Sequence, residues 1–465
     1  MVLQKLNLKE KIGYGFGDAA SSMFWKLFSM YLMFFYTDIF GIPAAVVGTM
    51  FLITRIWDAA FDPFVGVLGD RTETKWGKFR PYLLWMAIPF GIIGVLTFTT
   101  PLLSLSGKII YAYITYSLMM MVYSMINVPY ASLMGVMTAD GKERTTLATF
   151  RFIFAFGGSL LVLAAAEPLV DIFSKLGKGG IDLQLGWQLS VIVFAIIAIL
   201  FFWFTFSWTR ERIKPVTEKT SLKNDLNDLL KNSPWFILLG AGISAIFFNS
   251  IRDGAAIYYF KYYIQGQSAF TINAFNLTIT LSSLYFVLGQ AANIVGVILA
   301  KPVSDKIGKK NTFLFAMLFA SIFSVAFYWL DRNNVALIFV FQFLISINAG
   351  IIFPLVWSMY ADAADYSEWK TGRRATGLVF SASSMSQKFG WTLGGALAGW
   401  LLGYYGFKAN VVQTQEAQTG IRMMLSFFPA IGTLLGAFFM FIYPLKESFM
   451  ENIEGELAER RASKE

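Results

Sequence analysis

The 465-residue sequence contains no cysteine and no histidine. Without cysteine there are no disulfide bonds and no thiolate metal sites. Without histidine the most common metal ligand and the usual near-neutral proton relay are missing, so any coupling to an ion or a proton must rest on carboxylates. Charged residues are also scarce, at 14%, against about 25% in an ordinary soluble protein.

Apolar residues take the place of the missing charge. Hydrophobic residues make up 56% of the chain, and the mean hydropathy is +0.57. The 47 Phe and 13 Trp suit lipid-facing surfaces and interfacial belts. The composition therefore predicts an integral membrane protein. The net charge of +9 is expected to reflect orientation and contact with the lipid bilayer, not binding of nucleic acid.

A membrane-spanning helix needs about 20 apolar residues, and this criterion predicts about twelve spans. They lie near residues 12–38, 43–69, 80–103, 108–137, 147–170, 187–208, 235–264, 273–302, 312–330, 335–361, 373–404 and 421–444. Lys and Arg gather in the amino-terminal segment and in alternate loops, which predicts that both termini face the cytoplasm. The predicted location is the inner (cytoplasmic) membrane. The sequence carries no indication of oligomeric state.

An internal repeat indicates two similar halves. A motif of Pro, Asp, a basic residue and Gly-Lys surrounds Asp70 and occurs again around Asp305. A second repeated spacing supports this: Pro129 and Pro354 each lie eleven residues before an aspartate. Two similar halves of six helices are typical of a major-facilitator transporter. The predicted fold class is therefore an all-α polytopic membrane protein with twelve transmembrane helices in two pseudo-symmetric bundles.

The predicted organisation follows from these spans. A six-helix bundle covers residues 1–208 and a second one covers 235–445. Between them, the polar stretch 209–234 is expected to form a cytoplasmic loop with a short amphipathic helix, and a plain linker is the alternative. The charged stretch 446–465 is expected to form a cytoplasmic tail.

The second predicted span carries Asp58 and Asp62, which lie four residues apart and so on one face of a helix. Two carboxylates offer hard oxygens to a monovalent metal ion such as Na⁺, and the Ser124 hydroxyl and the Asn127 amide are candidates to complete the shell. A cation or a proton relieves the repulsion between the two acids. The alternative is a structural pair tied to Arg55 or to a basic residue of another helix. No cofactor is predicted beyond a coupling Na⁺ or H⁺.

Three further charged groups, Asp18, Arg151 and Lys388, lie inside apolar spans. A charge at membrane depth costs a few kcal/mol or more, so each group is expected to face a cavity or a partner. Both possibilities stay open: contact with sugar hydroxyls, or charge pairing among themselves. Further candidate substrate residues are polar or aromatic: Asn127, Arg252, Asp253, Tyr258 and Trp391.

The predicted cytoplasmic loops contain acidic and basic residues that are candidate gate salt bridges. Such pairs are expected to hold the cytoplasmic side shut and to break on opening, and solvated loop charges are the alternative. The candidates are Asp70, Arg71, Arg80, Asp140, Arg144, Asp305, Asp362, Asp365, Arg373 and Arg374.

Six stretches together resemble a known transporter family. They are GYGFGDAASSMFW, RIWDAAFDP, KWGKFRPYLLW, INVPYASL, IRDGAAIYYFKYY and YSEWKTGRRATG, the last with its later Lys388. In this order they resemble the glycoside–pentoside–hexuronide:cation symporters, the melibiose-permease-like branch of the major facilitator superfamily. The resemblance covers nearly the whole chain.

This resemblance implies uptake of a small sugar coupled to Na⁺, Li⁺ or H⁺ by alternating access. It places the cation site at Asp58 and Asp62, and it assigns the sugar to Asp18, Arg151 and Lys388 together with residues of the fourth span.

The chain departs from the family pattern at two positions. Asn127 stands where melibiose-permease-like members carry Asp, and Ala131 stands where they carry Trp, so the resemblance does not extend to a galactoside substrate or to a particular cation. A lipid or lysolipid transporter of the same fold is an alternative. A less favoured one is a membrane-embedded enzyme that uses paired carboxylates.

Overall fold

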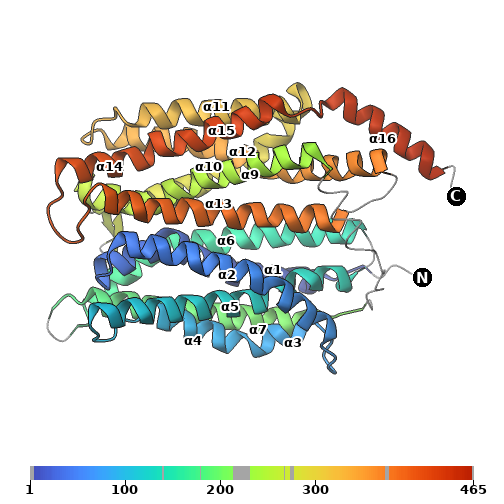
Figure 1. The fold of residues 1–465 in the computed structure, drawn as a ribbon. Helices are drawn as coiled ribbons and strands as arrows, with labels where there is room; N and C mark the ends of the chain where they lie inside the picture. The colour runs from blue at the N-terminus through green and yellow to red at the C-terminus, as the bar shows by residue number, and fades with distance from the viewer. Residues whose placement is uncertain are drawn as a thin grey trace. The chain divides into compact units, whose positions relative to one another are not determined.

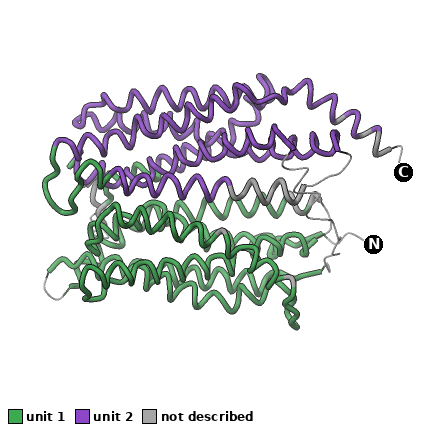
Figure 2. The backbone as a smooth tube through the Cα atoms, in the orientation of Figure 1, with its two compact units in different colours: residues 1–217, 265–287, 402–414 green, residues 218–264, 288–401, 415–465 purple. Residues whose placement is uncertain are grey.

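The computed structural model describes residues 5–138, 141–177, 180–212, 231–265, 268–272, 277–371 and 376–462. This part of the chain is almost entirely helical (Figure 1). Its contacts divide it into two units (Figure 2). Unit 1 comprises Met1–Thr217, Gln265–Val287 and Leu402–Thr414, and unit 2 comprises Glu218–Ile264, Leu288–Leu401 and Gln415–Glu465.

The amino-terminal region contributes the helices of unit 1. They are α1 (Leu8–Lys26), the π-helical turns η1 (Leu27–Leu32) and η2 (Phe35–Ile39), α2 (Ala44–Arg71), α3 (Arg80–Trp85), α4 (Ala87–Thr97), α5 (Leu105–Met137), α6 (Gly141–Ser174) and α7 (Leu183–Trp208). Helix α1 packs on α6 and α7, and α2 packs on α5.

The second half of the chain continues with helices on either side of a short hairpin. In order the elements are α9 (Ser233–Tyr258), η3 (Tyr259–Ile264), β1 (Ser268–Ile272), β2 (Leu277–Thr280), α10 (Leu281–Ile307), α11 (Lys309–Phe327), α12 (Val335–Thr371), α13 (Thr376–Tyr404), α14 (Gln415–Leu425), α15 (Phe427–Ile442) and α16 (Glu447–Ala462). Helix α15 packs on α9 and α11, around a core that includes Trp235 and Tyr360.

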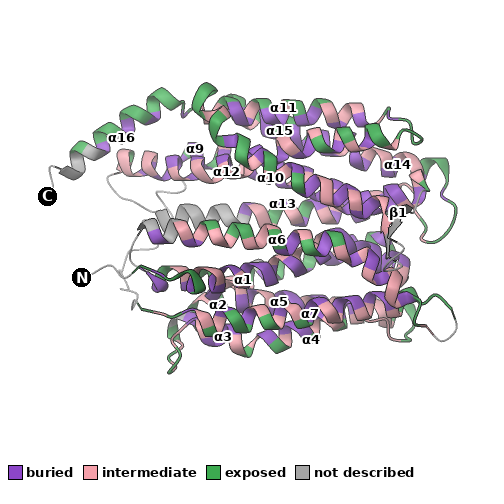
Figure 3. Ribbon diagram, turned by 180° about the vertical axis from the view of Figure 1, so that it is seen from behind, coloured by how far each residue is buried: buried purple, intermediate pink, exposed green. Residues whose placement is uncertain are grey.

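In the described part of the chain, nine helical spans are long and apolar enough to cross a membrane, and they coincide with nine of the predicted spans. The other three predicted spans are helical too. The first is α1 with its π-turns, the third is split at Met86 into α3 and α4, and the eleventh is α13. Large apolar side chains such as Ile92 and Phe441 lie exposed on the helices, as expected for a lipid-facing surface. Figure 3 shows exposed residues alternating with buried ones along the helices.

Two local features of the helices follow from the sequence: the start of α1 and the positions of proline. Helix α1 starts with a capping box, because Asn7 accepts a hydrogen bond from the Glu10 N–H and the Glu10 carboxylate accepts one from the Asn7 N–H. Proline lies inside four long helices that match in pairs between the two predicted sequence halves: Pro63 in α2 with Pro302 in α10, and Pro129 in α5 with Pro354 in α12.

The structure differs from the sequence-based boundaries at the eighth span. Residues predicted to begin this span instead form strand β2, which pairs antiparallel with β1 and places Thr271 opposite Thr278. Helix α10 begins only at Leu281. The apolar and β-branched run before it satisfies length and hydropathy in either conformation, so composition alone does not distinguish strand from helix.

Candidate functional site

Two acids and one hydroxyl meet inside unit 1. The Ser124 Oγ of α5 lies 2.8 Å from Asp58 Oδ1 and 2.7 Å from Asp62 Oδ1, both on α2. Asp58 and Ser124 are each 2% exposed, and Asp62 is half-buried. The two acids therefore lie on one face of α2, as their four-residue spacing predicts, and Ser124 lies within hydrogen-bond distance of both.

The cluster places two carboxylates around a single hydroxyl. Serine has one hydroxyl hydrogen and can donate it to one acceptor at a time. Two carboxylate oxygens lie within hydrogen-bond distance of the same oxygen. A proton on one carboxyl group, or a cation between the oxygens, makes the second contact more favourable.

A basic residue lies beside the acid pair. Arg55 Nη1 is 3.6 Å from Asp58 Oδ2, one turn along α2, and the guanidinium stands over the Trp25 ring at 4.6 Å from its centroid. This contact is the structural pairing considered from the sequence. It is longer than the Ser124 contacts, and the two arrangements coexist on different oxygens of Asp58.

The predicted partner Asn127 is directed at its own helix. Its Nδ2 donates to the Tyr123 carbonyl oxygen at 2.9 Å. The amide therefore satisfies one of its donors on α5, and the predicted role of Asn127 in cation or substrate binding stays a prediction.

The predicted substrate residues Asp18 and Arg151 form an ion pair in unit 1. Arg151 Nε on α6 lies 2.8 Å from Asp18 Oδ2 on α1, with the guanidinium over the Tyr130 ring at 5.5 Å. Tyr130 stacks on Tyr14 at 4.7 Å between centroids. Helices α1 and α6 approach closely here, because a Cβ on Gly158 would lie 2.5 Å from the carbonyl oxygen of the residue after Asp18.

One residue connects the ion pair with the acid pair. Tyr123 on α5 interacts electrostatically with both pairs, through Asp18 and Arg151 on one side and Asp58 and Arg55 on the other. Its ring centroid lies 5.9 Å from that of the Trp25 ring. Tyr123 escaped the sequence reasoning because a tyrosine inside an apolar span has no distinguishing pattern.

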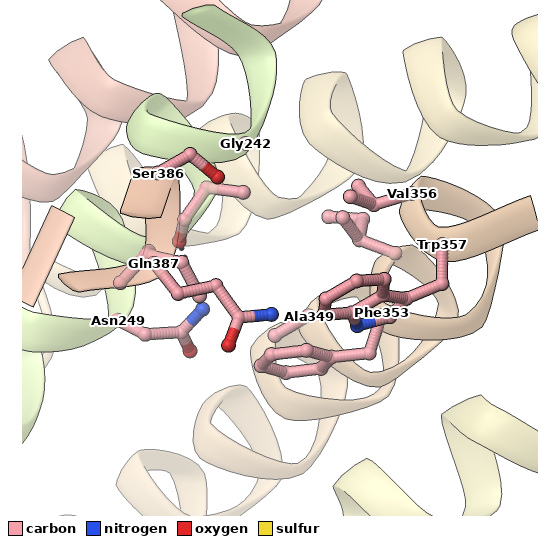
Figure 4. A pocket seen from close by; sticks show the side chains of 11 residues that line it. Gly242, Asn249, Ala349, Phe353, Val356, Trp357, Ser386 and Gln387 are labelled. Atoms are coloured by element: carbon pink, nitrogen blue, oxygen red, sulfur yellow. Dashed lines mark hydrogen bonds between the residues drawn. The ribbon is translucent and has the colours of Figure 1, made fainter. Parts of the chain in front are cut away.

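Unit 2 contains a small pocket of about 20 Å³ between α9, α12 and α13. Figure 4 shows the amides of Asn249 and Gln387 on one side of it and the rings of Phe353 and Trp357 on the other. Ser386 adds a hydroxyl to the lining. No charged side chain of the described residues lines this pocket.

The two predicted residues of α13 come shortly after the pocket-lining residue Gln387 in the sequence. Lys388 follows Gln387, and Trp391 lies one turn further, where its carbonyl oxygen accepts a hydrogen bond from Ser250 Oγ at 3.1 Å. The sequence reasoning missed Asn249 and Gln387, although an amide in an apolar span is a usable signal.

Two other predicted substrate residues are part of the packing. Arg252 is 5% exposed, donates to the carbonyl oxygen of Leu425 and to Gln342 Oε1 at 2.9 Å, and stands over the Phe327 ring. Tyr258 is fully buried. Asp253, the third predicted residue on α9, is half-buried. None of the three lines the pocket described in unit 2.

Two of the described gate candidates, Asp362 and Asp305, form ion pairs within unit 2. Lys309 Nζ donates to both Asp362 oxygens at 2.9 and 2.8 Å. Asp305 pairs with Lys301 at 2.8 Å, with both side chains largely exposed. Arg71 is exposed and Asp365 is half-buried.

Arg80 belongs to an arrangement that was not predicted. Its guanidinium donates twice to the Phe206 carbonyl oxygen, at 3.1 and 2.6 Å. The Glu211 carboxylate accepts hydrogen bonds from the backbone N–H groups of Lys78, Phe79 and Arg80, at 2.8 to 2.9 Å. The loop before α3 is therefore held by an acid from the chain just after α7.

Several gate predictions lie outside what the structure describes. These are the residues Asp140, Arg373 and Arg374 and the side chains of Asp70 and Arg144. The predicted amphipathic helix of the middle loop also lies outside the described residues.

The arrangement of long apolar helices, charged groups paired inside them and an internal sequence repeat defines a secondary membrane transporter. A solved structure of a mutant of the nucleoside transporter NupG has the same fold, with a TM-score of 0.64, 15% sequence identity, and coverage of 94% of this chain and 100% of that chain. The predicted fold class is confirmed, and the number of twelve helices stays a prediction.

Comparison with protein families identifies the particular group. Residues 13–447 match the family described as MFS/sugar transport protein, and the chain belongs to this family. The resemblance drawn from the six sequence motifs is thereby confirmed. The family and the named relatives are transporters, not enzymes, so the membrane-embedded enzyme considered from the sequence is excluded.

Three relatives match almost end to end. The inner membrane symporter YicJ of Escherichia coli is 39% identical, with 94% of this chain and 92% of the relative covered. The putative glycoside/cation symporter YagG of the same organism is 37% identical, with 99% and 97% covered. The isoprimeverose transporter of Lactiplantibacillus pentosus is 36% identical, with 97% and 92% covered.

Proposed function

We propose that the protein is a symporter that imports a glycoside, pentoside or hexuronide together with Na⁺ or H⁺ by alternating access. The observation that carries this proposal is the contact of Ser124 with both Asp58 and Asp62. This contact brings oxygens of two carboxylates around one hydroxyl, and hard oxygen ligands of this kind suit a small cation or a proton. The names of the relatives, a glycoside/cation symporter and an isoprimeverose transporter, support the same class of solute.

Coupling follows from the charge of this cluster. With both carboxylates ionised and no cation, the cluster carries excess negative charge at membrane depth, which is costly to bury. A bound cation or proton neutralises part of that charge and makes the closed, buried state more favourable. Conformational change then proceeds readily only with the ion in place, which ties solute movement to ion movement.

The Asp18–Arg151 pair is the proposed charged part of the sugar site in unit 1. A carboxylate accepts hydrogen bonds from sugar hydroxyls, and a guanidinium donates to sugar oxygens. The pair is only partly enclosed, with side-chain exposures of 12% for Asp18 and 31% for Arg151. Both groups can therefore exchange their mutual contact for contacts with a solute. Lys388 is proposed to add a further positively charged side chain to the sugar site.

The groups that line the pocket of unit 2 suit a sugar. Two amides and a hydroxyl can bond to hydroxyl groups on a small solute, while the Phe353 and Trp357 rings can stack on its C–H faces. The names of two relatives refer to a glycoside and to isoprimeverose, so the lipid transporter of the same fold is the weaker candidate.

The proposal is tested by uptake into proteoliposomes. A panel with isoprimeverose, a neutral methyl glycoside, a glucuronide and a lysolipid is offered under an imposed Na⁺ gradient or an imposed pH gradient. We expect accumulation of at least one sugar under one of the gradients. Transport of lysolipid with no sugar moving under either gradient contradicts the proposal.

Two variants locate the coupling. Asp58→Asn and Asp62→Asn are expected to abolish gradient-driven accumulation, because each removes one of the charges that the cation neutralises. Sugar binding is expected to survive at reduced affinity. Asp171→Asn on α6 is the control, since Asp171 forms an exposed pair with Lys175. If both α2 variants still accumulate sugar against its gradient, α2 has no role in coupling.

A further inference from the structure

Two tyrosines lie beside the Asp18–Arg151 ion pair of unit 1. Tyr14 lies on α1, one turn before Asp18, and Tyr130 lies on α5. Both side chains are fully buried, and their rings stack with centroids 4.7 Å apart and planes 18° apart. Neither tyrosine was among the residues predicted from the sequence, and the structure brings both to the proposed sugar site.

Each of the two tyrosines bonds to the backbone of the other. The Tyr130 hydroxyl donates to the Tyr14 carbonyl oxygen at 2.7 Å, and the Tyr14 hydroxyl donates to the Tyr130 carbonyl oxygen at 3.4 Å. Gly17 allows the ring to lie against α1, because a Cβ at this position would be 2.5 Å from Tyr130 Cε2. The Tyr130 ring is therefore held in place by the helix that carries Asp18.

The ring held in this way contacts Arg151. The guanidinium carbon lies over the Tyr130 ring at 5.5 Å from its centroid, while Nε donates to Asp18 Oδ2 at 2.8 Å. Tyr14 interacts electrostatically with both members of the ion pair. One hydrogen bond allows the plane of a guanidinium group to turn, whereas an aromatic face attracts the cation at a second point. The acid and the ring together therefore limit where the guanidinium can lie.

This second point of attachment matters most when the ion pair opens. A guanidinium group recognises oxygen atoms through N–H donors in a rigid fork, so its placement decides which sugar oxygens it reaches. When Asp18 turns to a sugar hydroxyl, Arg151 loses its hydrogen-bonded acid at membrane depth. The negative face of the Tyr130 ring continues to stabilise the cation there and keeps it near the solute.

We propose that Tyr130 is the positioning residue for Arg151, because its ring keeps the guanidinium in place when the ion pair opens to admit a solute. Tyr14 and Gly17 hold that ring against α1. The inference rests on the proposed sugar symport, since it concerns how the sugar site is supported. The contact between ring and guanidinium is also testable with no sugar present.

The test changes the charge of the ring face without changing its packing. Tyr130→Phe and the same protein with mono-, di- or trifluorinated phenylalanine at this position are prepared as full-length chains. Fluorine withdraws negative charge from the ring face, so attraction to a cation weakens with each fluorine. Isoprimeverose, a methyl glycoside and a glucuronide are titrated by calorimetry. We expect a Kd within about twofold of the intact protein for Tyr130→Phe and a rise of about fivefold or more for the trifluorinated form.

A matched control separates this effect from a general loosening of unit 1. Tyr36 on η2 is as fully buried as Tyr130, and its ring neighbours in the described structure are Phe35 and Phe40. The same fluorinated series at Tyr36 is expected to leave the Kd for each sugar within about twofold.

The measurement without sugar is the unfolding temperature of the purified protein. Across the series at Tyr130 it is expected to fall by about 1 °C or more. In an Arg151→Gln background, where no cation lies over the ring, this dependence on fluorine is expected to disappear. A purely structural ring would show the same dependence in both backgrounds.

A Kd that does not change with fluorine at Tyr130 overturns the proposal, as does an equal rise in the series at Tyr36. An unfolding temperature that keeps its fluorine dependence in Arg151→Gln also overturns it. An intact protein that binds none of the three sugars contradicts the proposed symport. That failure is distinguishable, because the unfolding temperatures still report the contact of Tyr130 with Arg151.

Discussion

The candidate sites of the two units differ in the kind of group that they offer to a ligand. In unit 1 the groups are charged: two acids share one hydroxyl on α2 and α5, and an acid pairs with Arg151 between α1 and α6. In unit 2 the pocket is lined by amides, a hydroxyl and aromatic rings, without a charged side chain among the described residues. The two units therefore offer charged groups in one case and uncharged polar and aromatic groups in the other.

The difference has a physical reason. Charges inside a membrane are costly and are retained only where a charge must be bound or moved. Amides and rings recognise an uncharged sugar surface at lower cost and do not respond to a cation. Unit 1 is therefore expected to carry coupling and the charged contacts with the sugar, whereas unit 2 is expected to recognise the uncharged surface of the sugar ring. The following predictions test this division, beginning with the largest effect.

The largest effect is expected at the ion pair of unit 1. Arg151→Gln leaves the Asp18 carboxylate without its partner, which costs about 3 kcal/mol at a partly exposed site. Sugar uptake is expected to disappear, and the unfolding temperature of the purified protein is expected to fall. Arg332→Gln, at an exposed loop position, is the control. Unchanged uptake and stability in Arg151→Gln contradict a role for the pair.

The next effect is expected at the hydroxyl shared by the acids. Ser124→Ala removes a hydrogen bond to a charged group, worth about 1.5–3 kcal/mol. The concentration of coupling cation that gives half-maximal uptake is therefore expected to change by about 10-fold or more. Ser132→Ala on the same helix is the matched control, since its exposed hydroxyl bonds only to the Val128 carbonyl oxygen among the described residues. Equal behaviour of the two variants argues against the site.

A smaller effect is expected in the pocket of unit 2. Gln387→Ala and Trp357→Ala each remove about 1–1.5 kcal/mol of contact with a sugar. The KM for sugar is expected to rise by about 10-fold, while its dependence on the cation is unchanged. Trp329→Ala, at a side chain 67% exposed, is the control. A lost cation dependence in the pocket variants contradicts the division between the units.

The smallest effect separates two gate candidates. Asp362 is largely buried and accepts twice from Lys309, whereas Asp305 and Lys301 are exposed. Asp305→Asn is expected to change uptake by less than about twofold, as is usual for a surface pair. Asp362→Asn is expected to lower it several-fold, measured as the initial rate of uptake. If the two variants have equal effects, Asp362 and Asp305 are better described as solvated loop charges than as gate residues.

The sequence predicted most of the architecture for physical reasons. Long apolar runs leave few options other than membrane helices. The four-residue spacing of Asp58 and Asp62 fixes a common helical face whatever surrounds them. The cost of isolated charges made the pairing of Asp18 with Arg151 predictable, and the structure contains that pair.

What escaped prediction depends on contacts between segments distant in the chain. The Asn249 and Gln387 amides are unremarkable in their own helices and become a pocket only when α9, α12 and α13 pack. The Glu211 contacts with the loop before α3 join residues about 130 apart in sequence. Strand β2 falls in the residues predicted to begin the eighth span, because β-branched apolar residues fit a helix or a strand.

The central claim is that the acid pair on α2 binds the coupling ion. The direct measurement is the Kd for sugar, by calorimetry on the purified protein, at several Na⁺ concentrations and several pH values. By reciprocity of linked binding, the account predicts that the Kd of the intact protein falls as one of the two cations increases. It also predicts that the Kd of Asp58→Asn no longer depends on that cation. An Asp58→Asn protein with the full cation dependence contradicts the account.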